Sequence, residues 1–231
     1  MLHDAPMVAD PARAWQAPGR IACVSDLTVL DHPLAHDLLS RLRDERTEAS
    51  QFRILTRRLG WLLVLEATKD LATEPVTVQT PMEPTPTERL SEHLVAVPVL
   101  RAGLGLLDAV TDLYPGTVVG YLGMERDEVT LQPRDYYAKL PPMQGRRALI
   151  LDPMLATGGS GAAAVTHVKA NAAPKSIGFV CVVAAPEGIE RMSAEHPDVA
   201  IVAGALDRQL NDVGVILPGL GDFGDRLHGT D

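Results

Sequence analysis

Five short, mostly apolar runs separated by helix-length stretches constrain the fold of this chain most strongly. The runs are Leu94–Leu100, Thr117–Met124, Ala148–Leu151, Ile177–Ala184 and Val199–Ala203. A strand that is apolar at successive positions is typically buried on both faces. Stretches with a helical pattern lie between the runs, at Leu104–Leu113, Gly161–Ala173 and Pro186–His196. The alternation predicts an α/β fold with a doubly wound parallel sheet and helices on both of its faces.

The first third of the chain follows a different pattern. Residues 1–28 are rich in Ala, Pro and Asp, and we expect a loosely attached extension there, followed by one domain over residues 29–231. Pro33 to Leu71 reads as helical, with Phe52, Leu55, Leu59 and Leu62 on one helix face. Residues 74–92 contain Pro75, Pro81, Pro84 and Pro86. These prolines exclude a central strand or a long helix and predict a protruding arm or loop.

Composition narrows the functional class. The chain has 231 residues, 46% of them hydrophobic, and a formal net charge of −9. This acidity argues against general binding to nucleic acid or to an anionic membrane. We find no apolar run long enough to span a membrane and no secretory signal, and the two cysteines, Cys23 and Cys181, form no disulfide framework. We expect a cytoplasmic protein.

The loop after the third apolar run carries the clearest chemistry. The buried strand ends in Asp152, crosses a short loop and enters a helix through Thr157-Gly-Gly-Ser160. Unpaired N–H groups at a helix start favour a phosphate, and two glycines let the backbone approach its oxygens. Asp152 would face sugar hydroxyls or a hydrated Mg²⁺.

Two other interpretations of this loop stay open. Thr-Gly-Gly-Ser is also typical of a helix N-cap and turn. Gly159 to Ala164 matches G-x-G-x-x-A, a dinucleotide-binding pattern that would indicate an oxidoreductase. That pattern normally begins at the strand end, whereas Asp152–Thr157 precede the first glycine here, so a phosphate and ribose site is the better interpretation.

Four segments in order resemble motifs of the uracil phosphoribosyltransferases. They are Val97–Gly105, Asp152–Ser160, Ala184–Ile189 and Leu217–Asp222, and the resemblance runs from about Asp31 to Thr230. It implies a phosphoribosyltransferase domain, and a reaction in which uracil and phosphoribosyl diphosphate (PRPP) give UMP and diphosphate. Mg²⁺ would arrive bound to PRPP; we expect no separate metal site in the protein.

The resemblance also assigns the residues that bind PRPP. Arg101 would fork onto the diphosphate, in a loop that in related enzymes carries a non-proline cis peptide, and Arg126 would contact PRPP as well. Arg101 is otherwise read as a surface salt bridge and Arg126 as a solvated turn charge. Tyr137 and Lys139 would either close over the site or pack. The full PRPP set is Arg101, Arg126, Asp152, Pro153, Met154, Leu155, Ala156, Thr157, Gly158, Gly159, Ser160 and Asp222.

The C-terminal stretch Leu210–Arg226 resembles the loop that holds uracil in this family. It implies uracil contacts from Ile216, Gly221, Asp222 and Phe223, and a catalytic set of Asp222, Arg101 and Asp152. Two residues depart from the family pattern, because Phe223 stands where a small Ala is usual and Val215 where a Tyr is usual. We expect the Phe223 ring either to narrow the base pocket or to swing out as a lid.

The resemblance extends to partners and regulation. Related enzymes are dimers or tetramers, and some are activated by GTP, so a homo-oligomer and a GTP effector are expected here. Phe223 and the N-terminal segment motivate one alternative, a non-catalytic PRPP or nucleotide sensor of the same fold. An RNA-binding regulator fits less well, since no basic stripe appears beyond Arg53–Arg58.

Overall fold

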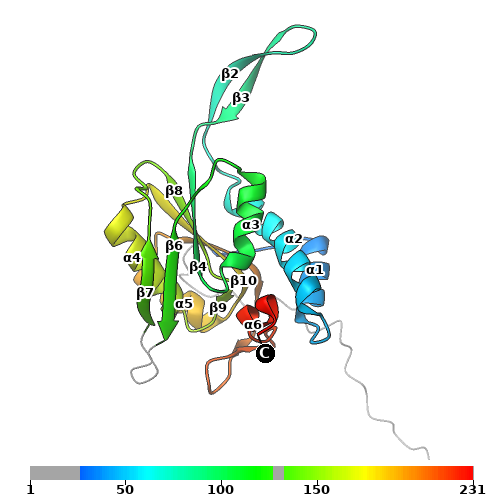
Figure 1. Cartoon of the computed structure of the whole chain (residues 1–231), viewed down its shortest axis with the longest axis vertical. Coiled ribbons are helices and arrows are strands. Elements are labelled where there is room, and N and C mark those ends of the chain that lie inside the picture. The colour runs from blue at the N-terminus through cyan, green and yellow to red at the C-terminus, as the bar shows by residue number, and fades with distance from the viewer. Residues whose placement is uncertain (1–26, 127–132, 231) are drawn as a thin grey trace, which may run out of the picture.

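A computed structural model describes residues 27–126 and 133–230 of the chain (Figure 1). The helices are α1 (Pro33–Arg43), α2 (Ala49–Ala67), α3 (Leu104–Leu113), α4 (Gly159–Ala172), α5 (Pro186–Glu195) and α6 (Phe223–His228). The first strands are β1 (Leu27–Val29), β2 (Thr73–Gln79), β3 (Pro84–Leu90), β4 (Leu94–Leu100), β5 (Val118–Val119), β6 (Tyr121–Arg126) and β7 (Pro133–Lys139). The later strands are β8 (Arg147–Leu151), β9 (Met154–Leu155), β10 (Ser176–Ala184), β11 (Ala200–Leu206), β12 (Gln209–Leu210) and β13 (Ile216–Leu217).

The main sheet has the order β1-β11-β10-β8-β4-β6-β7, with β5 paired to β4 and β9 to β10. All of its pairings are parallel except that between β6 and β7. The parallel sheet expected from the apolar runs is therefore confirmed. The antiparallel strand β7 was not expected.

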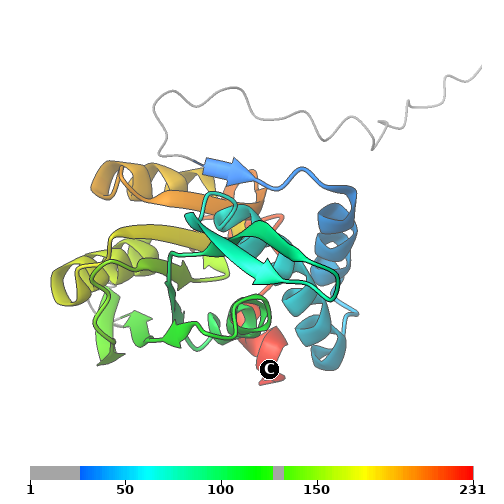
Figure 2. The ribbon, with the colours of Figure 1, turned by 90° about the horizontal axis from the view of Figure 1, so that it is seen from above.

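Successive residues of the central strands face two different cores. On β4, Leu94 and Ala96 pack with α1, α2 and α3, whereas Val95 and Val97 pack with α4 and α5. Figure 1 shows these two helical layers on opposite sides of the sheet, and Figure 2 shows the same division from above. Because both faces are covered, neither can carry polar residues, which explains why the runs are apolar at successive positions.

The arm prediction is confirmed, because β2 and β3 form an antiparallel hairpin separate from the main sheet. Figure 1 shows it projecting from the body at the end opposite to α6. Its base is fixed by the buried Glu92 carboxylate, which accepts hydrogen bonds from Lys175 Nζ (3.0 Å) and the Ala72 amide (3.4 Å). Prolines are tolerated in the arm because its strands have no neighbours beyond each other.

The structure adds detail to two parts of the N-terminal region. The helical stretch from Pro33 to Leu71 contains two helices, since the Asp44 carboxylate accepts the Arg46 amide (3.0 Å) and closes a turn that competes with helix. The sheet begins at Leu27, two residues inside the expected extension, because β1 pairs with β11. A three-residue strand leaves almost no periodic signal. Residues 1–26 lie outside the described part of the chain.

Candidate functional site

The loops expected to bind substrate meet at the carboxyl edge of the sheet. The side chain of Arg101, after β4, reaches towards the C-terminal segment, with Nη2 4.0 Å from Asp225 Oδ1. A Cβ on Gly214 would lie 3.6 Å from Thr157 Cγ2, so the β12–β13 turn adjoins the loop between β8 and α4. Three segments far apart in sequence thus surround one region, as is usual for ligand sites in sheets of this type.

The segment from Asp152 to Gly158 is held by backbone contacts with its neighbour strand. The Pro153 carbonyl accepts hydrogen bonds from the Val182 (2.9 Å) and Val183 (3.1 Å) amides, and the Leu155 carbonyl accepts the Ala185 amide (2.9 Å). Gly158 caps α4 with a φ of 74°, a left-handed conformation that favours glycine. The loop therefore presents the first amides of a 14-residue helix in a fixed direction.

The helix α5 supports this loop from behind. A Cβ on Gly188 would lie 2.5 Å from the Ala156 carbonyl oxygen and 2.7 Å from that of Leu155, so only glycine allows the approach. This explains the Ala184–Ile189 motif in physical terms. Arg191, which sequence reasoning missed, also lies here, with Nη1 3.2 Å from the position of a Gly159 Cβ. Its guanidinium is paired with Glu195 through Nε (2.8 Å), which leaves Nη1 beside the α4 N-terminus.

Asp152 directly follows β8 and carries a nearly buried carboxyl, 9% exposed. Burial raises its pKa to about 7, against a hydrogen bond from the Met154 amide that lowers it. The same apolar surroundings, with Asp152 nearby, raise the pKa of the Cys181 thiol, which is buried. A carboxyl with such a pKa gains or loses a proton near neutrality, and polar hydroxyls of a ligand would favour its charged form.

The loop after β4 contains the expected non-proline cis peptide, at Leu100–Arg101. Gly103 turns this loop back on the sheet, since a Cβ there would lie 2.3 Å from the Leu151 carbonyl oxygen. The Arg101 side chain is 63% exposed and directed to the site. Arg126 ends β6, but its side chain lies outside the described part of the structure. Tyr137 and Lys139 are exposed on β7.

Three predicted uracil-binding residues of the C-terminal loop, Ile216, Gly221 and Asp222, differ in solvent exposure. Ile216 is buried, whereas Gly221 and Asp222 are exposed. The Asp222 carboxylate caps α6 by accepting the Asp225 amide (3.0 Å). Val215 is 47% exposed, and its amide donates to Asn211 Oδ1 (2.8 Å).

The prediction for the Phe223 ring is wrong. Its side chain is 1% exposed and packs edge-on against Phe52, with ring centroids 5.1 Å apart. A Cβ on Gly105 would lie 3.2 Å from its Cε1, so Gly105 makes room for the ring between α2 and α3. The ring faces the core because α6 is amphipathic and its first residue lies on the buried side. The predicted contact of Phe223 with uracil would therefore have to come from its backbone.

Sequence reasoning also missed the side chains that hold the C-terminal loop. Arg43 and Asp207 form a bidentate pair that contacts Gly219, and Arg226 donates to the carbonyls of Leu42 and Leu220, each at 2.6 Å. No local pattern marks them, because the partners are 164 positions apart in the case of Arg43 and Asp207.

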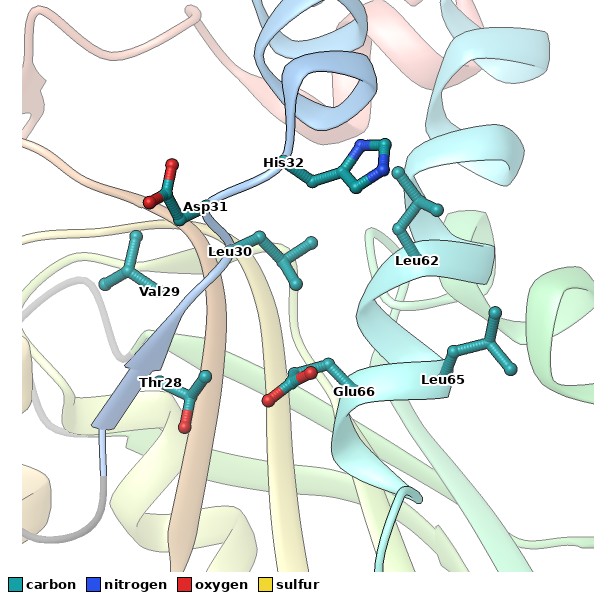
Figure 3. Close-up of a pocket in the computed structure, with 8 residues that line it drawn as sticks. All are labelled: Thr28, Val29, Leu30, Asp31, His32, Leu62, Leu65 and Glu66. Atoms are coloured by element: carbon teal, nitrogen blue, oxygen red, sulfur yellow. The ribbon is translucent and has the colours of Figure 1, made fainter.

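Two cavities lie beside β1 rather than at the loop edge. The smaller, about 350 Å³, is shown in Figure 3, where Leu30 and His32 point towards α2 and Val29 and Asp31 point to the other side of the segment; its lining is Thr28, Val29, Leu30, Asp31, His32, Leu62, Leu65 and Glu66. The larger, about 790 Å³, is lined by Val29, Leu30, Asp31, His36, Leu39, Ser40, Arg43, Gly204, Ala205 and Leu206. No residue predicted for PRPP or uracil lines either cavity. Over residues 27–126 and 133–230, no helix is both long and apolar enough to cross a membrane.

The mostly parallel sheet and the glycine-containing loop that enters α4 at its carboxyl edge are the arrangement expected of a phosphoribosyltransferase. The sequence model described as Uracil phosphoribosyltransferase matches residues 29–230. The chain belongs to the uracil phosphoribosyltransferase family, a family of pentosyltransferases.

Curated relatives and one solved structure agree with this assignment. The uracil phosphoribosyltransferase of Ligilactobacillus salivarius is 48% identical over 204 residues, covering 87% of this chain and 97% of the relative. That of Staphylococcus epidermidis is 47% identical over 209 residues, covering 90% of this chain and 100% of the relative. A solved structure of a protein from Aquifex aeolicus has a TM-score of 0.84 and 39% identity, covering 89% of this chain and 99% of its own.

Proposed function

We propose that this chain transfers the phosphoribosyl group of PRPP to N1 of uracil, giving UMP and diphosphate. The observation that carries the proposal is the meeting of a phosphate-type loop, an arginine loop and the C-terminal loop at one edge of the sheet, with Arg101 Nη2 4.0 Å from Asp225 Oδ1. A reaction that joins a base to a phosphorylated sugar needs those three elements side by side.

The loop entering α4 would hold the 5′-phosphate of PRPP. Amides of Gly158, Gly159 and Ser160 and the Thr157 hydroxyl supply neutral donors, and Pro153–Ala156 shape the loop below them. Asp152 would accept hydrogen bonds from the ribose hydroxyls. This arrangement accounts for an anionic substrate in a protein of net charge −9, since local donors and not net charge make the site.

Arg101, with Arg126, would bind the diphosphate as it leaves. The bond from C1 of the ribose to diphosphate breaks, positive charge develops on the sugar, and N1 of uracil forms the new bond. Stabilising the departing charge is the main contribution expected of the guanidinium groups. Asp222 would help to remove the proton from N1. Backbone groups of Ile216, Gly221 and Phe223 would match the carbonyl and N–H groups of uracil.

The residues present fit a Mg²⁺ ion that comes with PRPP. Among the described residues, no group of three or more His, Cys, Asp or Glu side chains is arranged to hold a metal. Asp152 offers one buried carboxylate beside the ribose position, which suits a hydrated ion held mainly by the diphosphate. When bound with PRPP, Mg²⁺ supplies positive charge to the leaving group.

The proposal includes a homodimer or homotetramer and a GTP effector. The arm supports the oligomer, because a two-stranded hairpin is marginally stable alone and this one carries Met82, 90% exposed, at its tip. GTP activation rests on the family resemblance alone. A cytoplasmic location follows from the substrate, since PRPP is too highly charged to cross an apolar bilayer.

The test is product analysis with PRPP, Mg²⁺ and a panel of bases. We expect UMP and diphosphate in equal amounts from uracil and no product from cytosine. Absence of UMP, with PRPP binding intact by calorimetry, would instead support the non-catalytic sensor. That alternative has lost one of its motives, because the Phe223 ring is in the core and does not obstruct the base.

A further inference from the structure

The amide and the carbonyl of Gly219 both form hydrogen bonds with one ion pair, Arg43 and Asp207. Its amide donates to Asp207 Oδ2 (2.9 Å), and its carbonyl accepts from Arg43 Nη1 (2.6 Å). The two side chains also bond to each other. Arg43 Nη1 donates to Asp207 Oδ2 (2.9 Å), and Arg43 Nη2 donates to Asp207 Oδ1. Four hydrogen bonds thus connect Arg43, Asp207 and the backbone of Gly219 in a closed network.

The pair comes from two elements on the far side of the loop. Arg43 is the last residue of α1, and Asp207 directly follows β11. The Asp207 side chain is 4% exposed and that of Arg43 is 18% exposed. A buried ion pair is an expensive way to stabilise a fold, since apolar residues of the same volume often do as well. A bidentate pair does, however, fix the orientation of both side chains, because two parallel hydrogen bonds allow only one relative geometry.

The next residue is fixed from the same helix end. Arg226 of α6 donates to the Leu220 carbonyl and, with its two terminal nitrogens, to the carbonyls of Leu42 and Asp44, each at 2.6 Å. Its guanidinium lies 4.6 Å from the centre of the Phe52 ring. The end of α1 therefore contacts Gly219 directly through Arg43, and it is linked to Leu220 through the Arg226 side chain.

These two residues sit between the groups proposed to meet uracil. Ile216 precedes them and Gly221 and Asp222 follow, so the direction of the Gly219 peptide sets where those backbone groups point. We propose that Arg43 and Asp207 are positioning residues for the uracil loop, which set the affinity for the base and act much less on the affinity for PRPP, because PRPP is expected to meet this loop at Asp222 only. The proposal rests on the proposed function, since it takes uracil to be the base bound there.

The phosphate loop gives the proposal its selectivity. That loop is held by backbone bonds to β10 and by α5. The side chains of Arg43 and Asp207 bond to each other and to Gly219, and Asp207 meets β10 through its backbone amide, which a side-chain substitution keeps. A purely structural ion pair would weaken the binding of both substrates alike, or only lower the melting temperature. A positioning pair would weaken the binding of uracil far more than that of PRPP.

The experiment compares Asp207→Asn with Asp112→Asn. Asp112 makes a bidentate pair with Arg57 between α3 and α2, away from the loop, so it matches the chemistry without the position. We expect Asp207→Asn to raise the KM for uracil about tenfold or more, with the Kd for PRPP, measured by calorimetry, within about twofold of wild type. Asp112→Asn should leave both constants unchanged. Arg43→Lys, which keeps the charge but not the fork, should give an intermediate KM.

Amide hydrogen exchange over residues 216–222 gives a readout independent of turnover. Exchange should be slow in wild type and fast in Asp207→Asn, while residues 152–160 stay unchanged. An unchanged uracil KM in an active, folded Asp207→Asn protein, or equal losses for uracil and PRPP, would overturn the proposal; so would unchanged exchange. If Asp207→Asn does not fold, Arg43→Met combined with Asp207→Leu removes both charges and takes its place in both measurements. Failure of wild type to make UMP sinks the proposed function instead, and exchange then still decides whether the pair orders the loop.

Discussion

The two halves of the candidate site are built on different principles. The phosphate loop, residues 152–158, is joined to β10 by backbone hydrogen bonds between residues no more than about 35 positions apart in the sequence. Glycines allow α5 to approach it closely. The C-terminal loop has a short β12–β13 pairing of its own, but its Gly219 end is held by the side chains of Asp207 and of Arg43, which lies more than 160 positions away. A loop held by backbone bonds tolerates side-chain changes around it, whereas a loop held by side chains depends on each of them. Four predictions test this contrast.

The largest expected effect is on the C-terminal half. Phe223→Ala removes a ring that is 1% exposed and packed on Phe52, so we expect the free energy of unfolding to fall by about 3 to 5 kcal/mol. Denaturant unfolding measures it. The uracil KM should rise with the loosened loop while base choice stays the same. A stable Phe223→Ala protein that accepts larger bases would show that the ring lines the pocket after all.

Asp152→Asn should raise the stability of the protein and lower its activity with PRPP. The native state holds the Asp152 pKa at about 7, above its ordinary 3.8, and so binds a proton more tightly than the unfolded chain. The resulting stability is full at low pH and is lost as the pH rises through about 7. At about pH 8 the variant should therefore be more stable than wild type by about 2 to 4 kcal/mol.

The same substitution should lower kcat/KM for PRPP by about 100-fold, because the ribose hydroxyls lose a charged acceptor. Thermal melts from about pH 4 to 8 and PRPP titrations provide the measurements. A parallel pH dependence of the two proteins would contradict the assignment of the pKa to Asp152.

Gly188→Ala tests the backbone half with a smaller change. The new Cβ would meet the carbonyl oxygens of Ala156 and Leu155 at 2.5 and 2.7 Å, so α5 must move away. We expect a loss of about 1 to 3 kcal/mol of stability and a higher Kd for PRPP. Amide hydrogen exchange of the uracil loop should stay as in wild type. Gly116→Ala is the control, because a Cβ there would meet no atom within 4 Å. Unchanged PRPP binding in Gly188→Ala would show that the loop does not depend on α5.

The smallest effect is expected at the arm, which belongs to neither half. Burial works against ionisation of Glu92, but Lys175, the Ala72 amide and Arg147 together lower its pKa. Its charge therefore stabilises the protein above the ordinary pKa, and that contribution is lost as the pH falls through the lowered value. Glu92→Gln should cost about 1 kcal/mol near neutrality and leave the Kd for PRPP as it is. A change in PRPP binding would couple the arm to the site.

The contrast also explains what the sequence could predict. The strands at Leu94–Leu100 and Ile177–Ala184 and the loop at Asp152–Ser160 were predictable because their signals are local: apolar runs, and a strand, a turn and a helix in succession. Asp44 ended α1 through a hydrogen bond two residues away, a weaker local signal that the helical pattern concealed.

Contacts between distant segments could not be predicted in this way. Phe223 was assigned to the base pocket because its neighbours in sequence belong there, whereas its ring is fixed by Phe52, 171 positions earlier (223 minus 52). Arg43 and Asp207 look like ordinary surface charges until the fold brings them to Gly219. The roles of Arg101, Asp152 and Asp222 towards substrate stay predictions that the experiments above can test.

The grip of α1 on Gly219 has a consequence for how the protein is made. A ribosome releases α1 and α2 early, but the loop that Arg43 and Phe52 hold is synthesised about 170 residues later. Until then the aromatic surface of α2 is uncovered, and contacts of such long range form slowly. Chains that stop before residue 219 lack Asp222 and the Phe223 ring that packs on Phe52, so we expect a truncated product to be unstable and inactive. The last few per cent of the chain thus decide when the enzyme becomes active.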